Sequence, residues 1–344
     1  MLFLGFESAV QYWRVVRSDL LPYPAHSKLV MVECEDHLLK EVDDSAPDLP
    51  IDKQSITHVL VHDRRLFHKS KKIEYHLCAK PLPAGSFCQH VYGVVVASPE
   101  LTLLQAAQDL GNKGFTTLLE LCCEFFGDYS LDDGERRGFA NCRPLVTRDQ
   151  MLEYLGRLPK RTYGAKILGK AVELAGEHSR SPRETECYLA MTLPPELGGF
   201  GLPRPILNLP SPIDDGDFSI TDDRGYLVDL AWNDGMVIFE YDGVIDHTEK
   251  EKVLQDKERR SVLASMGKTV IVATKESVSN DEMFRKKVAQ VFRALDIPLP
   301  SFSDDEVTAQ SKLRETLFDP AHHRKSPYIT PIIPKEGVVG HIET

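Results

Sequence analysis

Alternating apolar and polar positions mark one stretch of the chain above all others, residues 225–243 (GYLVDLAWNDGMVIFEYDG). Two alternating runs flank the tripeptide Asn233-Asp234-Gly235. An Asp-Gly pair between such runs is the strongest short-range hairpin signal, because a type I′ turn needs positive φ at both central residues. With Asp234 and Gly235 at the turn, Asn233 pairs with Met236. The pattern therefore predicts two antiparallel strands joined by a tight turn.

The register of this hairpin sorts its side chains onto two faces. Counting outward from the turn, Asp229 falls opposite Glu240, and Asp242 shares their face because it lies two residues further along. The other face reads as core and comprises Tyr226, Val228, Leu230, Trp232, Val237, Phe239 and Tyr241. Like charges directly opposite each other destabilise a strand pair. Either a divalent cation such as Mg²⁺ binds these carboxylates, or the acidic face is simply solvated.

Periodicity and capping signals predict a mixture of helices and strands elsewhere, and hence an α/β (α+β) fold. In the N-terminal half we expect a helix starting at residue 7 with Ser8 as its N-cap, strands at 56–61, 73–78 and 90–97, and helices after Ser98-Pro99 and over 115–126, 149–156 and 163–177. In the C-terminal half we expect a helix at 181–193, strands at 206–209 and 217–221, the hairpin, a helix at 250–266, a strand at 268–273, and helices at 281–295 and 303–317.

These elements suggest a domain at 1–150, a helical linker at 151–177, a domain at 178–299 and a tail at 300–344. The net charge of −11 argues against a protein that coats nucleic acid non-specifically, although a local basic groove is compatible with it. The seven cysteines include no C-x-x-C pair, which is typical of reduced thiols in a cytoplasm. No apolar run is long enough to cross a membrane, and we identify no signal peptide.

Four histidines in the N-terminal half, His58, His62, His68 and His76, raise the question of a metal site. They lack cysteine or carboxylate companions at the spacing of a zinc site. We therefore interpret them as polar positions of a small sheet rather than as ligands.

The order helix, three antiparallel strands, helix, strand, helix over residues 178–299 resembles the restriction-endonuclease-like core of the PD-(D/E)XK superfamily. The motifs resemble those of the small bacterial domains related to the very-short-patch mismatch repair endonuclease. They are Ser181-Pro182-Arg183-Glu184, Val228-Asp229-Leu230-Ala231-Trp232, Glu240-Tyr241-Asp242-Gly243, His247, Asp256-Lys257-Glu258-Arg259-Arg260 and Gly267-Lys268-Thr269-Val270.

This resemblance implies that Asp229 and Glu240 hold Mg²⁺ or Mn²⁺ and that Glu184 adds a carboxylate, directly or through water. It also places His247 near the scissile phosphate. The alternative for Glu184 is structural, since S-x-x-E is a capping box.

The chain departs from the superfamily at one position, because Asp242 stands where the usual lysine lies two residues after the second acid. Lys257 or Arg260 could supply the missing charge, Asp242 could be a third ligand, or the site could be inactive. These three alternatives remain open at the level of the sequence.

The N-terminal half resembles the region of AbiEi-like abortive-infection antitoxins, through His58-Val59-Leu60-Val61 and the segment from Val94 to Ser98-Pro99-Glu100. A winged helix is not evident at the extreme N-terminus, so we do not expect direct operator binding. Together the resemblances imply a metal-dependent DNA endonuclease or nickase. The alternatives are a catalytically inactive regulator that binds DNA or a toxin protein, and a structural pair of domains whose acids are merely exposed.

Overall fold

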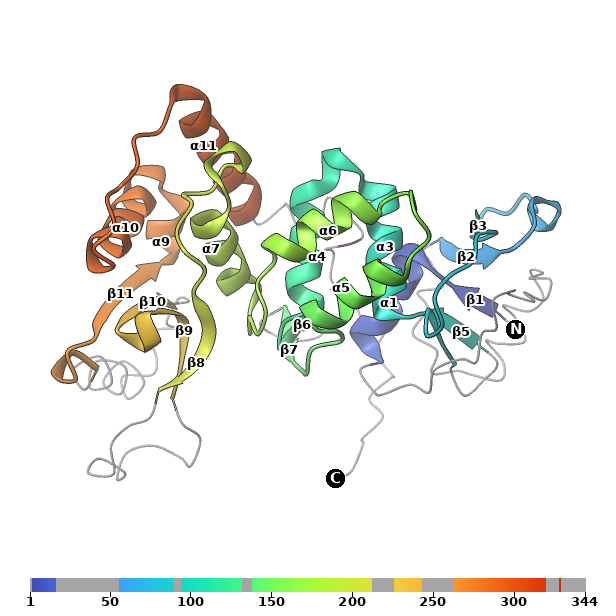
Figure 1. Cartoon of the computed structure of the whole chain (residues 1–344), viewed down its shortest axis with the longest axis horizontal. Helices are drawn as coiled ribbons and strands as arrows, with labels where there is room; N and C mark the ends of the chain where they lie inside the picture. The colour runs from blue at the N-terminus through green and yellow to red at the C-terminus, as the bar shows by residue number, and fades with distance from the viewer. Residues whose placement is uncertain are drawn as a thin grey trace. The chain divides into compact units, whose positions relative to one another are not determined.

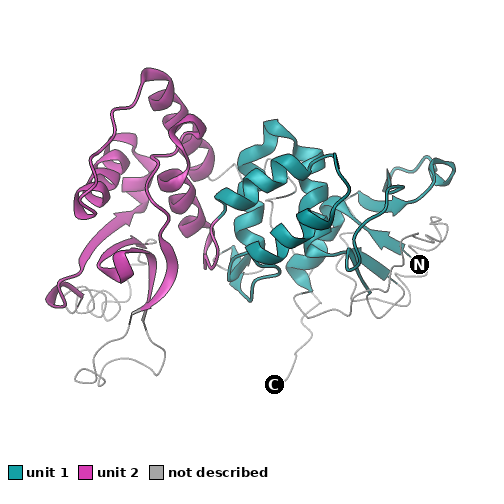
Figure 2. Ribbon diagram, viewed as in Figure 1, with its two compact units in different colours: residues 1–175, 323–344 teal, residues 176–322 magenta. Residues whose placement is uncertain are grey.

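The computed structural model describes residues 2–16, 56–89, 94–131, 138–211, 226–242, 263–319 and 328. The chain divides into two compact units (Figure 2). Unit 1 comprises residues 1–175 and 323–344, and unit 2 comprises residues 176–322. Helices and strands are mixed in both units, which confirms the α/β fold class (Figure 1).

Unit 1 contains a mixed sheet in the strand order β3-β2-β1-β5-β4. Its strands are β1 (Leu2–Leu4), β2 (Thr57–Val61), β3 (Ile73–Leu77), β4 (Phe87–Gln89) and β5 (Val94–Ala97). β2 runs parallel to β3, and β1 runs parallel to β5. The strands predicted at 56–61 and 73–78 are confirmed, and the strand predicted at 90–97 is confirmed over its described residues 94–97. The strands β1 and β4 were not predicted, because three residues are too few to show a period.

The described helices of unit 1 are α1 (Phe6–Val15), α3 (Pro99–Leu110), α4 (Phe115–Phe125), α5 (Arg148–Arg157) and α6 (Ala165–Leu174). A separate two-stranded sheet consists of β6 (Tyr129–Leu131) and β7 (Phe139–Asn141). Two short 3-10 helices are η1 (Arg64–Leu66) and η2 (Asn112–Gly114). α3 begins as predicted, with Ser98 accepting a hydrogen bond from the Leu101 amide and Pro99 in the first turn. The prediction that Ser8 caps α1 is wrong. Gly5 is the N-cap, and the Ser8 hydroxyl instead accepts from the amide of His58 on β2.

A buried ion pair joins α1 to α4. Arg14 donates to both carboxylate oxygens of Glu124, at 2.9 Å from Nε and 2.8 Å from Nη2. The two side chains are only 1% and 2% exposed. Arg14 also donates to the carbonyl oxygen of Tyr328, so the end of the chain returns to unit 1 at this pair.

Unit 2 contains a sheet in the order β11-β10-β9-β8. Its strands are β8 (Ile206–Ser211), β9 (Tyr226–Trp232), β10 (Val237–Asp242) and β11 (Thr269–Thr274). β8, β9 and β10 pair antiparallel, and β11 runs parallel to β10 over all six residues of each strand. The helices are α7 (Pro182–Thr192), α9 (Lys275–Ser279), α10 (Asp281–Ala294) and α11 (Asp304–Phe318), with η3 at Pro195–Leu197 and η4 at Asn233–Gly235.

The order of elements in unit 2 agrees with the order predicted for residues 178–299, as far as the described residues extend. Of the helix predicted at 250–266, only residues 263–266 are described; residues 263–265 are helical and Met266 is in a turn. The strand predicted at 217–221 lies outside the described residues. Within the described ranges, no helix is both long enough and apolar enough to cross a membrane.

The predicted hairpin is confirmed in both its turn and its register. Asp234 has φ 54° and ψ 34°, Gly235 has φ 84°, and the Met236 amide donates to the Asn233 carbonyl at 3.1 Å. These are the features of a type I′ turn. β9 and β10 pair Trp232 with Val237 and continue in that register to Leu230 and Phe239.

The apolar face predicted for the hairpin is confirmed, and of the two alternatives for the acidic face, metal-bound or solvated, the solvated one is wrong at Glu240. Val228, Leu230 and Phe239 are buried as expected. Ile238 on the other face is also fully buried, however, and Glu240 is only 4% exposed. Because β10 lies between two partner strands and packs on both faces, a simply solvated acidic face is excluded at Glu240.

Candidate functional site

Counted outward from the turn, the acids of the hairpin come directly after its last paired residues, Leu230 of β9 and Phe239 of β10. That pairing, extended by one residue, would set Asp229 opposite Glu240. Asp229 Oδ2 accepts a hydrogen bond from the amide of Tyr241 at 2.8 Å, so its carboxylate reaches across to β10. Asp229 and Asp242 are partly buried, and Glu240 is buried. Asp229 and Glu240 thus lie just beyond the last paired residues of the hairpin, at the end away from the turn.

Glu184 lies in the first turn of α7, and its contacts are those of a helix cap. Its amide donates to Ser181 Oγ at 3.2 Å. Its carboxylate accepts from Ser181 Oγ at 2.9 Å, from the Arg180 amide at 2.8 Å and from Asn208 Nδ2 on β8 at 2.8 Å. Burial raises the pKa of Glu184, and these hydrogen bonds oppose that rise. The carboxylate therefore fastens the start of α7 to the edge strand of the sheet.

The three carboxylates predicted as ligands do not form one compact donor group. Among the described residues, only His58, Glu74 and His76 provide three His, Cys, Asp or Glu ligand atoms that all lie within 4.8 Å of one another. The role of Glu184 as a ligand stays a prediction. The remaining predicted residues His247, Lys257 and Arg260 lie outside the described residues.

A cation near the hairpin acids was not considered in the sequence analysis. Arg183 on α7 forms an ion pair with Glu186, whose side chain is 1% exposed, while the Arg183 side chain keeps 30% exposure. The Arg183 guanidinium also interacts electrostatically with Tyr241, the neighbour of Glu240, and opposes the rise in the Tyr241 pKa that burial causes. The signal was present in the sequence, because Arg183 is the variable residue of the S-P-x-E motif.

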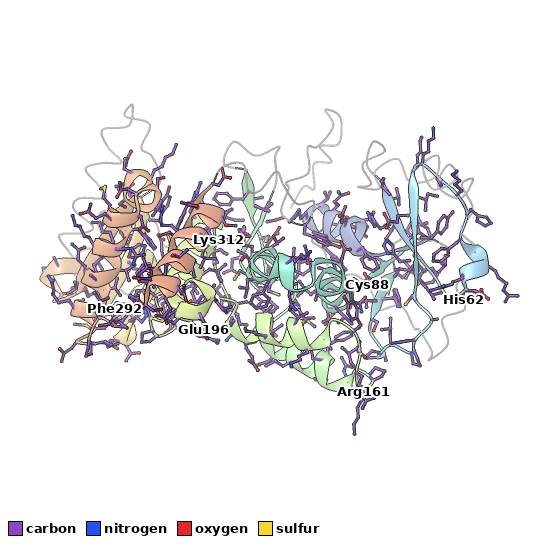
Figure 3. All side chains as sticks on the ribbon, turned by 90° about the horizontal axis from the view of Figure 1, so that it is seen from above. His62, Cys88, Arg161, Glu196, Phe292 and Lys312 are labelled. Carbon is purple, nitrogen blue, oxygen red and sulfur yellow. The ribbon has the colours of Figure 1, made fainter. Side chains whose placement is uncertain are left out.

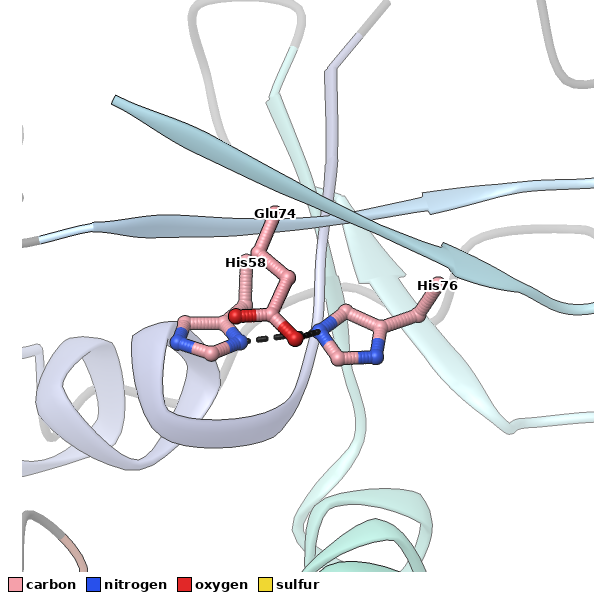
Figure 4. Close-up of side chains that lie close together, drawn as sticks. All are labelled: His58, Glu74 and His76. Atoms are coloured by element: carbon pink, nitrogen blue, oxygen red, sulfur yellow. Dashed lines mark hydrogen bonds and ion pairs between the residues drawn. The ribbon is translucent and has the colours of Figure 1, made fainter. Parts of the chain in front are cut away.

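The compact donor group lies in unit 1, on two neighbouring strands (Figure 4). His58 comes from β2, whereas Glu74 and His76 come from β3. His58 Nδ1 lies 2.8 Å from His76 Nε2, and Glu74 Oε1 lies 4.0 Å from the same nitrogen. His62 and His68 are exposed and take no part in this group; Figure 3 labels His62.

The interpretation of these histidines as mere polar positions of a sheet overlooked this proximity. The group depends on the parallel register that sets His58 beside Glu74, and spacing along the chain does not reveal that register. The available signal was the alternation of Glu74 and His76, which places both side chains on one face of a strand.

Comparisons with known proteins returned no match for this chain, whether with protein-family models, with curated proteins or with solved structures.

Proposed function

We propose that unit 2 is a metal-dependent DNA endonuclease or nickase whose Mg²⁺ or Mn²⁺ is held by Asp229 and Glu240. The observation that supports this most directly is the hydrogen bond from the Tyr241 amide to Asp229 Oδ2, which brings the Asp229 carboxylate to the backbone next to Glu240. Two carboxylates completed by waters and a substrate phosphate are a usual Mg²⁺ environment. The strand order of unit 2 and the motif resemblance over residues 178–299 give further support.

In this proposal each residue has a definite task. Asp229 and Glu240 supply anionic oxygens from two rigid, paired strands, so their separation is fixed by the sheet rather than by a loop. Glu184 holds the start of α7 against β8 and thereby positions Arg183 near the hairpin. Because Arg183 is paired with buried Glu186, Lys257 or Arg260 stays the candidate for the positive charge that the missing lysine would supply. The bound metal would polarise the phosphate and lower the pKa of an attacking water.

The second candidate is a regulator that binds DNA or a toxin protein without cleaving DNA. Two observations favour it. Asp242 stands at the position of the usual lysine, and the Glu184 carboxylate accepts three hydrogen bonds typical of a structural role. His247, Lys257 and Arg260 remain candidates for water activation or phosphate contact under the first proposal only.

Cleavage of supercoiled plasmid and of a mismatched duplex, with Mg²⁺ or Mn²⁺, tests the proposal. The variants Asp229→Asn and Glu240→Gln keep the shape of each side chain and remove its charge, so both should abolish nicking. The matched control is Glu196→Gln, since Glu196 is an exposed acid of the same unit (Figure 3). Nicking by the wild type and the control alone would support the enzyme.

Two other outcomes would decide against it. DNA binding without cleavage at any metal concentration would favour the regulator. Cleavage that persists in both Asp229→Asn and Glu240→Gln would identify a contaminating nuclease or a different site.

A further inference from the structure

The His58, Glu74 and His76 group in unit 1 is built by strand pairing rather than by a loop. β2 and β3 run parallel, and their register pairs His58 with Glu74. Glu74 and His76 lie two residues apart, so both side chains project from the same face of β3. Figure 4 shows side chains from the two strands extending towards one another. The ligand atoms are thus brought together by the most regular part of the unit.

The chemistry of this donor set is selective. Two imidazoles and one carboxylate form the ligand set of many catalytic zinc sites and of other first-row divalent metals. Mg²⁺ and Ca²⁺ prefer oxygen ligands instead.

The second nitrogen of His58 has the partner that a metal-bound histidine usually has. His58 Nε2 lies 3.4 Å from Glu7 Oε2, on the first turn of α1. The His58 amide also donates to Ser8 Oγ at 2.9 Å. A carboxylate that accepts the outer N–H of a ligating histidine fixes the tautomer and the ring orientation. Here that arrangement leaves Nδ1 directed at His76.

Phe6 covers the other ring of the group. Its ring stacks on His76 with 3.8 Å between centroids and an angle of 20° between the planes. Phe6 has φ 50°, which is an outlier for a bulky residue, and its amide donates to Gln105 Oε1 at 2.9 Å. Residues held in such conformations cluster at functional sites. The strained backbone of Phe6 keeps an apolar wall against His76.

From these four features we propose that His58 Nδ1, His76 Nε2 and a Glu74 carboxylate oxygen bind Zn²⁺ or a similar first-row divalent cation. The Glu74 side chain is 56% exposed, so a water molecule can occupy the fourth position from the solvent side. The two ring nitrogens lie 2.8 Å apart. A tetrahedral zinc ion with Zn–N distances of about 2.0–2.1 Å would hold them roughly 3.3 Å apart, so binding separates the rings by about 0.5 Å.

Untagged full-length protein, stripped with a chelator and titrated with Zn²⁺ by calorimetry and with Co²⁺ by visible absorption, tests the proposal. We expect one histidine-bound site with the absorption of tetrahedral Co²⁺. His76→Ala should weaken Zn²⁺ binding at least 100-fold, and Glu7→Gln should weaken it about 10–100-fold. His62→Ala is the matched control and should leave affinity unchanged, because His62 is exposed and outside the group.

Glu74→Gln is the variant that guards against misfolding, since this exposed side chain contributes little to the core, and it should weaken binding at least tenfold. Absence of a stoichiometric Zn²⁺ site in the wild type, or equal affinity in the wild type, His76→Ala and Glu74→Gln, would overturn the proposal. The absorption of Co²⁺ bound to His58 and His76 reports on unit 1, since the carboxylates proposed in unit 2 supply only oxygen ligands, so this result is separable from the nuclease test.

Discussion

Replacing Glu184 by alanine separates the structural role of this residue from a role as a metal ligand. The carboxylate accepts hydrogen bonds from Ser181, Arg180 and Asn208, and the residue is 8% exposed. A hydrogen bond to a charged group contributes about 1.5–3 kcal/mol net. Burying a carboxylate costs several kcal/mol, which offsets most of the stabilisation from the three hydrogen bonds together.

The net loss expected from Glu184→Ala is therefore close to that of a strong helix cap, about 2 kcal/mol. Asn208 retains its second hydrogen bond, to the carbonyl of His178 at 2.6 Å, which limits the damage to the sheet edge. With a urea m-value of about 1–3 kcal/mol/M, this loss lowers the unfolding midpoint of unit 2 by about 1 M.

Tryptophan fluorescence provides the assay, because the two tryptophans of the chain lie in different units. Trp232 is 5% exposed and donates to the carbonyl of Pro203 at 2.7 Å, so it reports on unit 2. Replacing Trp13 by phenylalanine in all samples removes the signal of unit 1. Glu196→Ala serves as the control and should shift the midpoint by less than about 0.2 M, since exposed substitutions usually change stability little.

The difference in unfolding free energy between wild type and Glu184→Ala should depend on pH in a defined direction. Burial raises the pKa of folded Glu184 above its ordinary value of 4.5, so the folded state holds the proton more tightly than the unfolded state. This contribution to stability is present below pH 4.5 and is lost as the pH rises through the folded pKa. The stability gap between wild type and Glu184→Ala should therefore widen as the pH falls from 8 towards 4.5.

Titration with Mn²⁺ completes the comparison. If Glu184 is a cap, Glu184→Ala should keep Mn²⁺ affinity near the wild-type value under conditions where the variant is folded. An unchanged urea midpoint combined with a tenfold loss of Mn²⁺ affinity would refute the capping argument and restore Glu184 as a ligand.

Three further substitutions test the packing and turn arguments by urea unfolding. Arg14→Ala should destabilise unit 1 by about 3–5 kcal/mol, because it leaves the Glu124 charge buried and unpaired. The control is Arg157→Ala, which removes an exposed ion pair with Glu153, and an equal effect of the two substitutions would contradict the prediction. Gly235→Ala should cost about 1–2 kcal/mol in unit 2, since φ 84° is unfavourable for an L side chain. Ser98→Ala should cost about 0.5–2 kcal/mol through loss of the α3 cap, and an unchanged midpoint would show that the cap is dispensable.

Local signals in the sequence were sufficient where the physical cause is local. The Asp234-Gly235 turn fixed the hairpin register, and Ser98-Pro99 fixed the start of α3, because each signal acts within four residues. The local capping signal was misleading at Ser8, because its hydroxyl accepts a hydrogen bond from the His58 amide on β2 instead of capping α1. The central strand β1 was missed because its pairing with β2 and β5 is entirely non-local.

The candidate sites divide in the same way. The turn and the pairing of Trp232 with Val237 follow from a hairpin, so the sequence predicted them, whereas the apposition of Asp229 and Glu240 stays a prediction. The proximity of His58 and His76 depends on the parallel pairing of β2 with β3, which are joined by residues 62–72. The spacing of the four histidines along the chain did not reveal this pairing. The contacts of Glu184 were foreseen only as an alternative, because a capping box and a metal ligand use the same residue at the same spacing.

The return of the chain to unit 1 has a consequence for the order in which the protein is made. Unit 2 is a continuous stretch, residues 176–322, enclosed by two stretches of unit 1. Tyr328 is 1% exposed, accepts from Arg14 and donates to Asp109 at 3.1 Å. Domains generally fold as units during synthesis. On the ribosome, unit 2 can therefore finish folding before unit 1 receives Tyr328, and a nonsense codon shortly after residue 322 would spare unit 2 while leaving unit 1 without a buried side chain.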